Sequence, residues 1–163
     1  MALGDITVWG PGGENLPPSY RYRTEAGSTA INAGEPVVIG GTGSNYVAVL
    51  ADGTPTTTNL MTGVATSTST HTASANGVVD VCLALPGVVF KAKAKSAATI
   101  DTDAELLAVL NDRVVLDLTA GSYTVDVAAG DAATNGIRIL GGDIVTGDVF
   151  FTVMVESTTL TSD

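Results

Sequence analysis

We expect a mainly β fold, and three features of the sequence predict it. The chain has 163 residues, of which 45% are hydrophobic but only 15% are charged. Threonine, valine and glycine are abundant, at 23, 20 and 19 residues, whereas a helical bundle would be rich in Leu, Glu, Lys and Arg. Short apolar runs recur between Gly, Pro and Asp, as in the strands of a small barrel or sandwich. The prediction is therefore a small β-barrel or sandwich with one short helix and an extended arm at each end.

Residues 1–25 are predicted to form the N-terminal arm. Gly10–Gly13 and Pro17-Pro18 interrupt regular structure, yet the segment is too rich in aromatic residues for a flexible linker. Its aromatic and basic side chains are candidate partner contacts, because Trp, Tyr and Arg are favoured at interface hot spots. They are Trp9, Tyr20, Arg21, Tyr22 and Arg23. An arm folded back on its own domain would use the same residues, so both interpretations stay open.

Residues 26–155 form the predicted β domain, and turn residues delimit its strands. Each expected strand is a short apolar or β-branched run bounded by Gly, Pro, Asp or Asn. In order, these runs are 37–39, 46–50, 63–65, 78–85, 88–95, 113–118, 123–128, 137–140 and 149–155. Asn135-Gly136 is a candidate type I′ turn. The polar residues 156–163 are predicted to form a short C-terminal tail.

One helix is expected, at about residues 102–111. Asp101 or Thr102 can cap it, and Glu105 follows Thr102 at the spacing of a capping box. An apolar stripe of Ala104, Leu107, Ala108 and Leu110 would face the β domain, and Asn111 can end the helix. A helix of this length is marginal alone, so it must pack on the sheet.

The charge balance excludes several classes of partner. The chain carries 7 basic and 17 acidic residues, for a net charge of −10, which disfavours nucleic acid and anionic membrane surfaces. No apolar run is long enough for a transmembrane helix. The start of the chain lacks the basic and apolar segments of a secretory signal, so we expect synthesis in a cytoplasm. The single cysteine, Cys82, lies in an apolar run and is expected to be a buried, inert thiol.

The search for catalytic chemistry finds no convincing site. His71, the only histidine, lies in a polar Ser/Thr tract and is expected at the surface rather than beside a nucleophile. Two carboxylate pairs, Asp101 with Asp103 and Asp143 with Asp148, are better explained by helix capping and turn formation than by acid–base chemistry or a bound cation. We therefore expect no enzyme activity, no cofactor and no metal.

Lys91, Lys93 and Lys95 are a second candidate contact patch. Their period-2 spacing places all three on one strand face, with Ala92 and Ala94 on the other. Lysines at such positions protect an edge strand from unwanted pairing, and this is the favoured interpretation. The alternative is a basic stripe that meets an acidic partner surface.

Several short motifs resemble the capsid cement, or head decoration, proteins of tailed bacteriophages. Ala33–Gly40 is similar to the "AGDPVVIG" opening of that family, and Met61–Thr66 to its Gly-Val-Ala strand. Val79–Lys93 resembles the family pattern "V-x-V-x-L-x-G-V-F-x-x-x-K", and Ile137–Val155 its closing strands. The resemblance covers roughly residues 26–155. The first 25 residues and residues 96–135 are longer than in the family.

The resemblance implies a non-enzymatic structural protein with a small β-barrel-like fold. It would coat the outer surface of an expanded icosahedral head as a homotrimer or homodimer at a local symmetry axis. There it would bind the major capsid protein and clamp neighbouring subunits together. A fibre or adhesin module that binds glycan or a host surface is the alternative, and it would need an aromatic platform.

Overall fold

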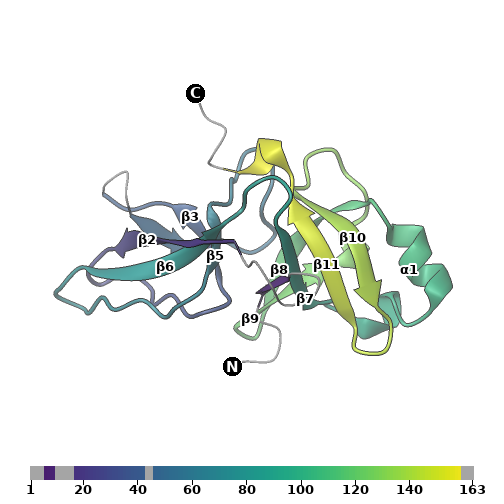
Figure 1. The fold of residues 1–163 in the computed structure, drawn as a ribbon, viewed down its shortest axis with the longest axis horizontal. Coiled ribbons are helices and arrows are strands. Elements are labelled where there is room, and N and C mark those ends of the chain that lie inside the picture. The colour runs from purple at the N-terminus through teal and green to yellow at the C-terminus, as the bar shows by residue number, and fades with distance from the viewer. Residues whose placement is uncertain (1–5, 10–16, 43–45, 159–163) are drawn as a thin grey trace.

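Two antiparallel sheets, one of six strands and one of five, make up the computed structural model (Figure 1). The structure describes residues 6–9, 17–42 and 46–158. The predicted mainly β class with a single short helix is confirmed, and of the two architectures expected the sandwich-like one is found. Neither sheet forms a closed barrel.

The six-stranded sheet has the order β1-β7-β11-β10-β8-β9. Its strands are β1 (Thr7–Trp9), β7 (Val89–Lys93), β8 (Arg113–Thr119), β9 (Ser122–Asp126), β10 (Ile137–Asp143) and β11 (Asp148–Val153). The sheet curls strongly, so that Ala94, just beyond β7, forms an isolated bridge with Val125 of β9. A single bridge brings the two strands together without closing the sheet.

The five-stranded sheet has the order β2-β6-β5-β3-β4. Its strands are β2 (Ser19–Thr24), β3 (Pro36–Ile39), β4 (Val47–Val49), β5 (Gly63–Ala65) and β6 (Gly77–Leu83). This sheet also curls, which brings Arg23 of its first strand, β2, next to Tyr46 beside its last strand, β4. An isolated bridge joins the two residues.

Side-chain alternation along the central strands divides the interior into two hydrophobic clusters. Val79 and Val81 of β6 belong to the smaller cluster, inside the curl of the five-stranded sheet. Cys82, which points to the opposite face, belongs to the larger cluster with Phe90 and Phe151 of the six-stranded sheet. The middle of the five-stranded sheet is therefore buried on both faces, and the expected burial of Cys82 is confirmed.

The short helix α1 (Asp103–Val109) begins where the capping box predicts. The Thr102 side chain accepts a hydrogen bond from the Glu105 amide, and the Glu105 carboxylate accepts one from the Thr102 amide. Of the predicted apolar stripe, Leu110 packs on the larger cluster as expected, but Ala104, Leu107 and Ala108 are exposed, Leu107 at 67%. Leu106 and Val109 pack on the cluster in their place. Three 3₁₀ turns complete the helical structure, at Ala97–Thr99, Val127–Ala129 and Val155–Ser157.

The tight hairpin turn lies at Ala120-Gly121 rather than at Asn135-Gly136. Thr119 pairs with Ser122 across it, and the φ angles of 53° and 83° at the two central residues are those of a type I′ turn. The prediction for Asn135-Gly136 is wrong, because neither residue has the positive φ that a type I′ turn requires. The side-chain amide of Asn135 instead donates to the carbonyls of Arg113 and Gly130 and anchors a longer loop.

Both ends of the described chain are attached to the body. Residues 6–9 and 19–24, within the predicted N-terminal arm, are extended but pair with β7 and β6. At the other end, Ser157 and Thr158 are buried, and Thr158 forms a bridge with Met61. The rest of the predicted arms, residues 1–5, 10–16 and 159–163, lies outside the described residues.

Candidate functional site

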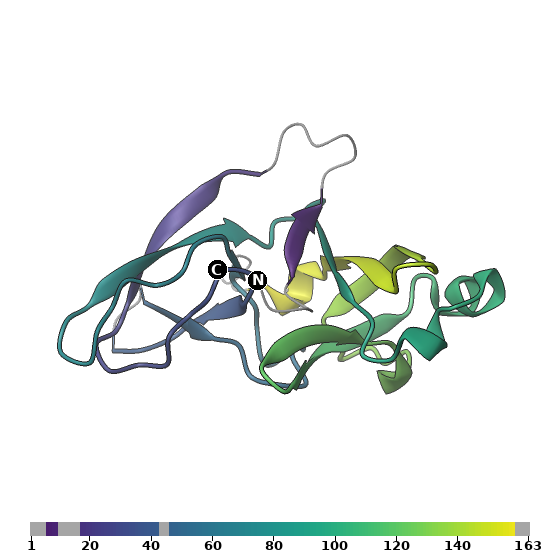
Figure 2. The same cartoon turned by 90° about the horizontal axis from the view of Figure 1, so that it is seen from below.

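The predicted N-terminal contact residues lie on two strands that are each the outermost strand of a sheet. β1 ends the six-stranded sheet and β2 ends the five-stranded sheet. Figure 2 shows these two strands, both purple, on the same side of the molecule. In the described part of the chain, β2 meets a further segment on its outer side only at Arg23, through the bridge to Tyr46.

Trp9 lies on the outer face of the six-stranded sheet. Its strand alternates, so that Val8 packs against the larger cluster while Trp9 stays 37% exposed. The indole ring rests beside Phe150 of β11, with ring centroids 4.6 Å apart. The pair forms a partly exposed aromatic surface next to the outer edge of β1, which pairs with no further strand among the described residues.

The four predicted residues of β2 have different surroundings. Arg21 makes a bidentate ion pair with Asp80 of β6, with Nε–Oδ1 at 2.9 Å and Nη2–Oδ2 at 3.2 Å. This pairing raises the pKa of Arg21 and lowers that of Asp80. Tyr22 packs against the smaller cluster, and burial raises the pKa of its hydroxyl. Arg23 lies over the Tyr46 ring at 5.6 Å, whereas Tyr20 is 48% exposed.

Lys91, Lys93 and Lys95 share one strand face, as the spacing predicts, and Ala92 and Ala94 are buried on the other. All three ammonium groups are paired within the chain. Lys91 and Lys93 bind Asp148 at 3.3 and 2.7 Å. Lys95 binds Asp117 at 2.8 Å and Asp126 at 3.0 Å. The favoured interpretation that these lysines protect an edge strand is wrong, because β7 is an interior strand between β1 and β11.

These ion pairs alter the pKa values of the groups involved. Hydrogen bonds to Asp117 and Asp126 raise the pKa of Lys95, and the bond from Lys95 lowers that of Asp117. Burial pushes the pKa of Asp148 upward, but the two lysines and Thr146 outweigh it and leave the value lowered. The lysine stripe is therefore largely neutralised by carboxylates from β8, β9 and β11.

Arg138, which is not among the predicted contact residues, lies on the same outer face as Trp9 and the lysines. It sits in β10 between the buried Ile137 and Ile139. Among the described residues no carboxylate or aromatic ring pairs with it, and its Nε is buried without a hydrogen-bond partner there. The alternation Ile-Arg-Ile was the signal that could have placed this guanidinium on a sheet face.

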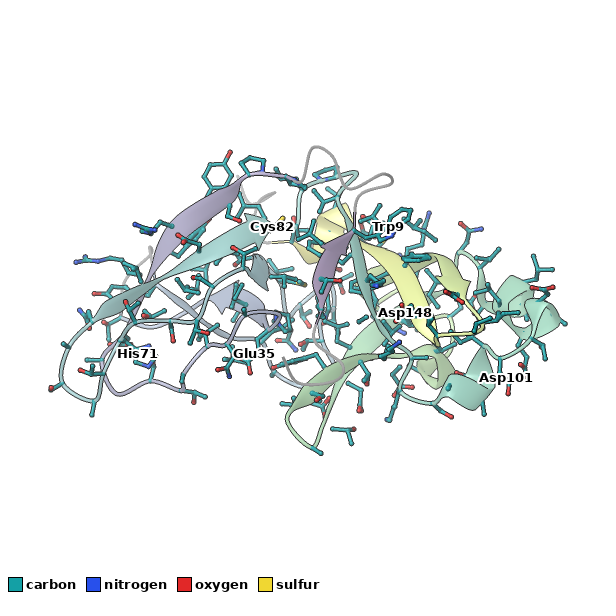
Figure 3. All side chains as sticks on the ribbon, turned by 60° about the horizontal axis from the view of Figure 1, so that its bottom comes forward. Trp9, Glu35, His71, Cys82, Asp101 and Asp148 are labelled. Atoms are coloured by element: carbon teal, nitrogen blue, oxygen red, sulfur yellow. The ribbon has the colours of Figure 1, made fainter. Side chains whose placement is uncertain are left out.

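The other candidate groups do not assemble into a catalytic centre. His71 Nε2 lies 3.0 Å from the Ser28 carbonyl and 3.4 Å from the Ser28 hydroxyl. Since a carbonyl only accepts hydrogen bonds, this contact assigns the proton to Nε2, which then cannot take one from Ser28. Figure 3 shows His71 and Asp101 at opposite ends of the molecule. Asp143 accepts hydrogen bonds from the Val145 and Thr146 amides, which lower its pKa, as expected of a turn residue.

Among the described residues, no three His, Cys, Asp or Glu side chains lie close enough to hold a metal ion. A cleft of about 470 Å³ lies between β3–β4 and the loop of residues 50–60, with Val38, Val49 and Asp52 in its lining. No helix in the described ranges is long and apolar enough to cross a membrane.

Comparison with known proteins finds no match at the level of sequence. No model of a known protein family fits the chain, and no curated protein is similar to it. The described residues thus form two outermost strands, a partly exposed aromatic pair, three paired lysines and one arginine that has no ion-pair or aromatic partner among them.

Proposed function

We propose that this protein is a structural capsid cement protein that binds the outer surface of an expanded phage head. One observation carries the proposal: both N-terminal strands are outermost strands on the same side of the molecule, and both carry exposed aromatic side chains, Trp9 and Tyr20. The short motifs that resemble the cement family give it its specific form.

The outermost strands provide the means of attachment. An unpaired strand edge offers backbone donors and acceptors to an extended segment of another chain. Trp9 and Tyr20 stand beside these edges and can bury aromatic area against the partner, the kind of contact that dominates interface energies. The partner in this proposal is the major capsid protein, contacted by a homotrimer or homodimer at a local symmetry axis.

The energetics suit a lattice that is covered with many copies. A protein that binds only the expanded lattice stabilises it by its differential affinity for that state. Linked contacts add strength through effective concentration, so each contact can be modest. The net charge of −10 keeps such a coat soluble and away from DNA.

The direct test is co-sedimentation of the purified protein with expanded heads that lack it. We expect Trp9→Ala and Tyr20→Ala each to weaken binding by about thirtyfold, the loss that corresponds to an interface hot spot of about 2 kcal/mol. Leu107→Ala is the matched control, because this exposed apolar residue lies on α1, away from both strands. The proposal fails if the wild-type protein does not bind, or if heads without it resist heat and low salt equally well.

Deletion of the whole N-terminal segment is a poorer test than these point variants. Removing residues 1–25 takes away both β1 and β2, together with the buried Ile6 and Thr24. Collapse of the domain would then be indistinguishable from loss of a contact.

The second candidate function is a module that binds glycan on a host surface. The Trp9–Phe150 pair favours it, because partly exposed aromatic rings are the platforms on which sugars stack. Binding of the isolated protein to a glycan array, lost in Trp9→Ala, together with no binding to heads, would favour this function over the first.

A further inference from the structure

We propose that the outer face of the six-stranded sheet binds an acidic segment of a partner protein, with Arg138 as the residue that receives a partner carboxylate. The proposal goes beyond attachment through the strand edges. It rests on the proposed function only in naming the capsid protein as the partner that supplies the carboxylate.

The strand register defines this face. Trp9 lies opposite Val89, Thr152 opposite Arg138, and Arg138 opposite Arg113. β11 and β7 are antiparallel, and Phe151 lies opposite Phe90. One residue further along, Thr152 of β11 therefore lies beside Val89 of β7. A row of outward-facing residues thus crosses β1, β7, β11, β10 and β8, and we call it the Arg138 row: Trp9, Val89, Thr152, Arg138 and Arg113. Phe150 adjoins the row at Trp9.

Arg138 differs from every other cation of the chain. All seven Lys and Arg residues lie in the described ranges. Five of them form ion pairs, and Arg23 lies over the Tyr46 ring. Within the described ranges Arg138 has neither kind of partner, although most of the 17 acidic residues of the protein lie there.

The immediate surroundings of Arg138 favour an added negative charge. Arg113, directly opposite on β8, is also cationic, and like charges facing each other across strands repel. Arg113 already uses Nη2 on Glu156, at 2.7 Å, and Nε on the Asn135 carbonyl, at 3.1 Å. A carboxylate from outside the chain would relieve this repulsion.

The guanidinium of Arg138 is positioned for such a contact. Its Nε is covered and has no partner, while the two terminal nitrogens are neither buried nor bonded within the described chain. A carboxylate can accept two parallel hydrogen bonds from one guanidinium, which is the strong geometry for this pair. Because Nε is covered by the chain, the two accessible terminal nitrogens are the donors that a partner carboxylate can reach.

The other residues of the Arg138 row favour a polypeptide segment over a nucleic acid as the bound partner. Val89 and the Trp9–Phe150 pair offer apolar area beside the charge, which fits a segment that alternates acidic and apolar side chains. A nucleic acid would bring many phosphates close to a protein with a net charge of −10 and would be repelled. The surface also continues from the free edge of β1, where the proposed attachment begins.

Nuclear magnetic resonance of the four arginine Nε–H groups tests this inference directly. The probe is an acetylated peptide of alternating glutamate and valine, and the matched peptide has glutamine in place of glutamate. We expect the Arg138 Nε resonance to shift and saturate with the glutamate peptide, with at least tenfold weaker binding of the glutamine peptide. In Arg138→Gln the glutamate peptide should no longer shift the indole N–H resonance of Trp9, whereas Arg21→Gln, at an exposed site that is paired with Asp80, should leave that shift unchanged.

Three results would overturn the inference. They are equal shifts of all four arginines, no shift at peptide concentrations up to about 1 mM, and a response to a sialylated glycan in place of the peptide. If Arg138→Gln does not fold, Arg138→Lys treated with a carbodiimide supplies the second test, because a contacting carboxylate would be cross-linked at position 138.

Binding to heads separates this inference from the proposed function. If Arg138→Gln binds heads as tightly as the wild type, the Arg138 row is not the capsid contact and the inference fails while the function stands. If the wild-type protein does not bind heads but the Arg138 resonance still shifts with the acidic peptide, the proposed function is wrong and the proposed binding site at Arg138 stands.

Discussion

Tyr123 connects the two sheets through one buried hydrogen bond. Its side chain is 2% exposed, and its hydroxyl donates to the Leu50 carbonyl at 2.6 Å. Leu50 follows β4 of the five-stranded sheet, whereas Tyr123 belongs to β9 of the six-stranded sheet. Burial, together with the nearby carboxylates of Glu35 and Asp52, raises the pKa of Tyr123 to about 12.

We expect Tyr123→Phe to destabilise the fold by about 1–3 kcal/mol, because it leaves the Leu50 carbonyl without its partner in a buried place. Urea unfolding followed by circular dichroism measures the change. Tyr20→Phe is the control, since Tyr20 is 48% exposed and its hydroxyl can bind water. Equal stabilities of the two variants would contradict the importance of the Leu50 contact.

The raised pKa of Tyr123 also predicts a loss of stability in alkali. The folded state favours the protonated phenol, so this contribution is complete below pH 10 and is lost between pH 10 and about 12. In Tyr123→Phe the free energy of unfolding should fall less steeply over the same range. Chemical unfolding at several alkaline pH values measures this free energy. If it falls equally steeply with pH in the two proteins, Tyr123 is not the group responsible.

At the scale of elements, α1 depends on its N-terminal cap. The helix has seven residues, too few to be stable alone, and only the partly buried Leu106 and Val109 anchor it on the core. We expect Thr102→Ala to cost about 0.5–2 kcal/mol locally, seen as faster amide exchange over residues 103–109. Thr57→Ala, at an exposed loop position, should change nothing there. Unchanged exchange in the helix of Thr102→Ala would show that packing, not the cap, holds it.

Local signals predicted some elements, while others depended on distant residues. The capping box and the nine apolar runs could be read directly, because their determinants lie within a few residues of each other. Which face of α1 packs on the core could not be predicted, because seven residues hold too few apolar positions to define one face. β1 and β2 escaped prediction since Gly and Pro interrupt the segment that holds them, and only pairing with β7 and β6 makes them strands.

The candidate site shows the same limit at the scale of the whole molecule. Period-2 spacing placed the three lysines on one face, but their carboxylate partners lie at least 22 residues away in the sequence, from Lys95 to Asp117. The isolation of Arg138 is likewise a property of the folded sheet, because it depends on which acidic residues β8 and β11 bring near. The spacing of charged residues along the chain indicates which sheet face they share. The sheet topology then determines whether those side chains form ion pairs with residues from other strands.

Lys95 holds together the open side of the six-stranded sheet. It lies just beyond β7 and binds Asp117 of β8 and Asp126 of β9, across the gap that the single bridge from Ala94 to Val125 spans. In the folded protein the pKa of Asp117 is lowered, first by the bond from Lys95. The stabilisation is therefore complete above the ordinary carboxyl pKa and is lost as the pH falls through the lowered one.

We expect Lys95→Met to be less stable than the wild type at neutral pH, with a difference that shrinks as the pH falls below about 4. The reason is that the Asp117 carboxylate loses the hydrogen bond from Lys95 in the variant, so its pKa returns toward the ordinary carboxyl value. Urea unfolding at neutral and acidic pH measures both differences. Lys93→Met is the matched control, because Lys93 binds Asp148 on β11 and does not bridge the gap. Amide exchange of β9 should therefore rise in Lys95→Met and not in Lys93→Met, and equal exchange in both would mean that the bridge and the core alone hold β7 against β9.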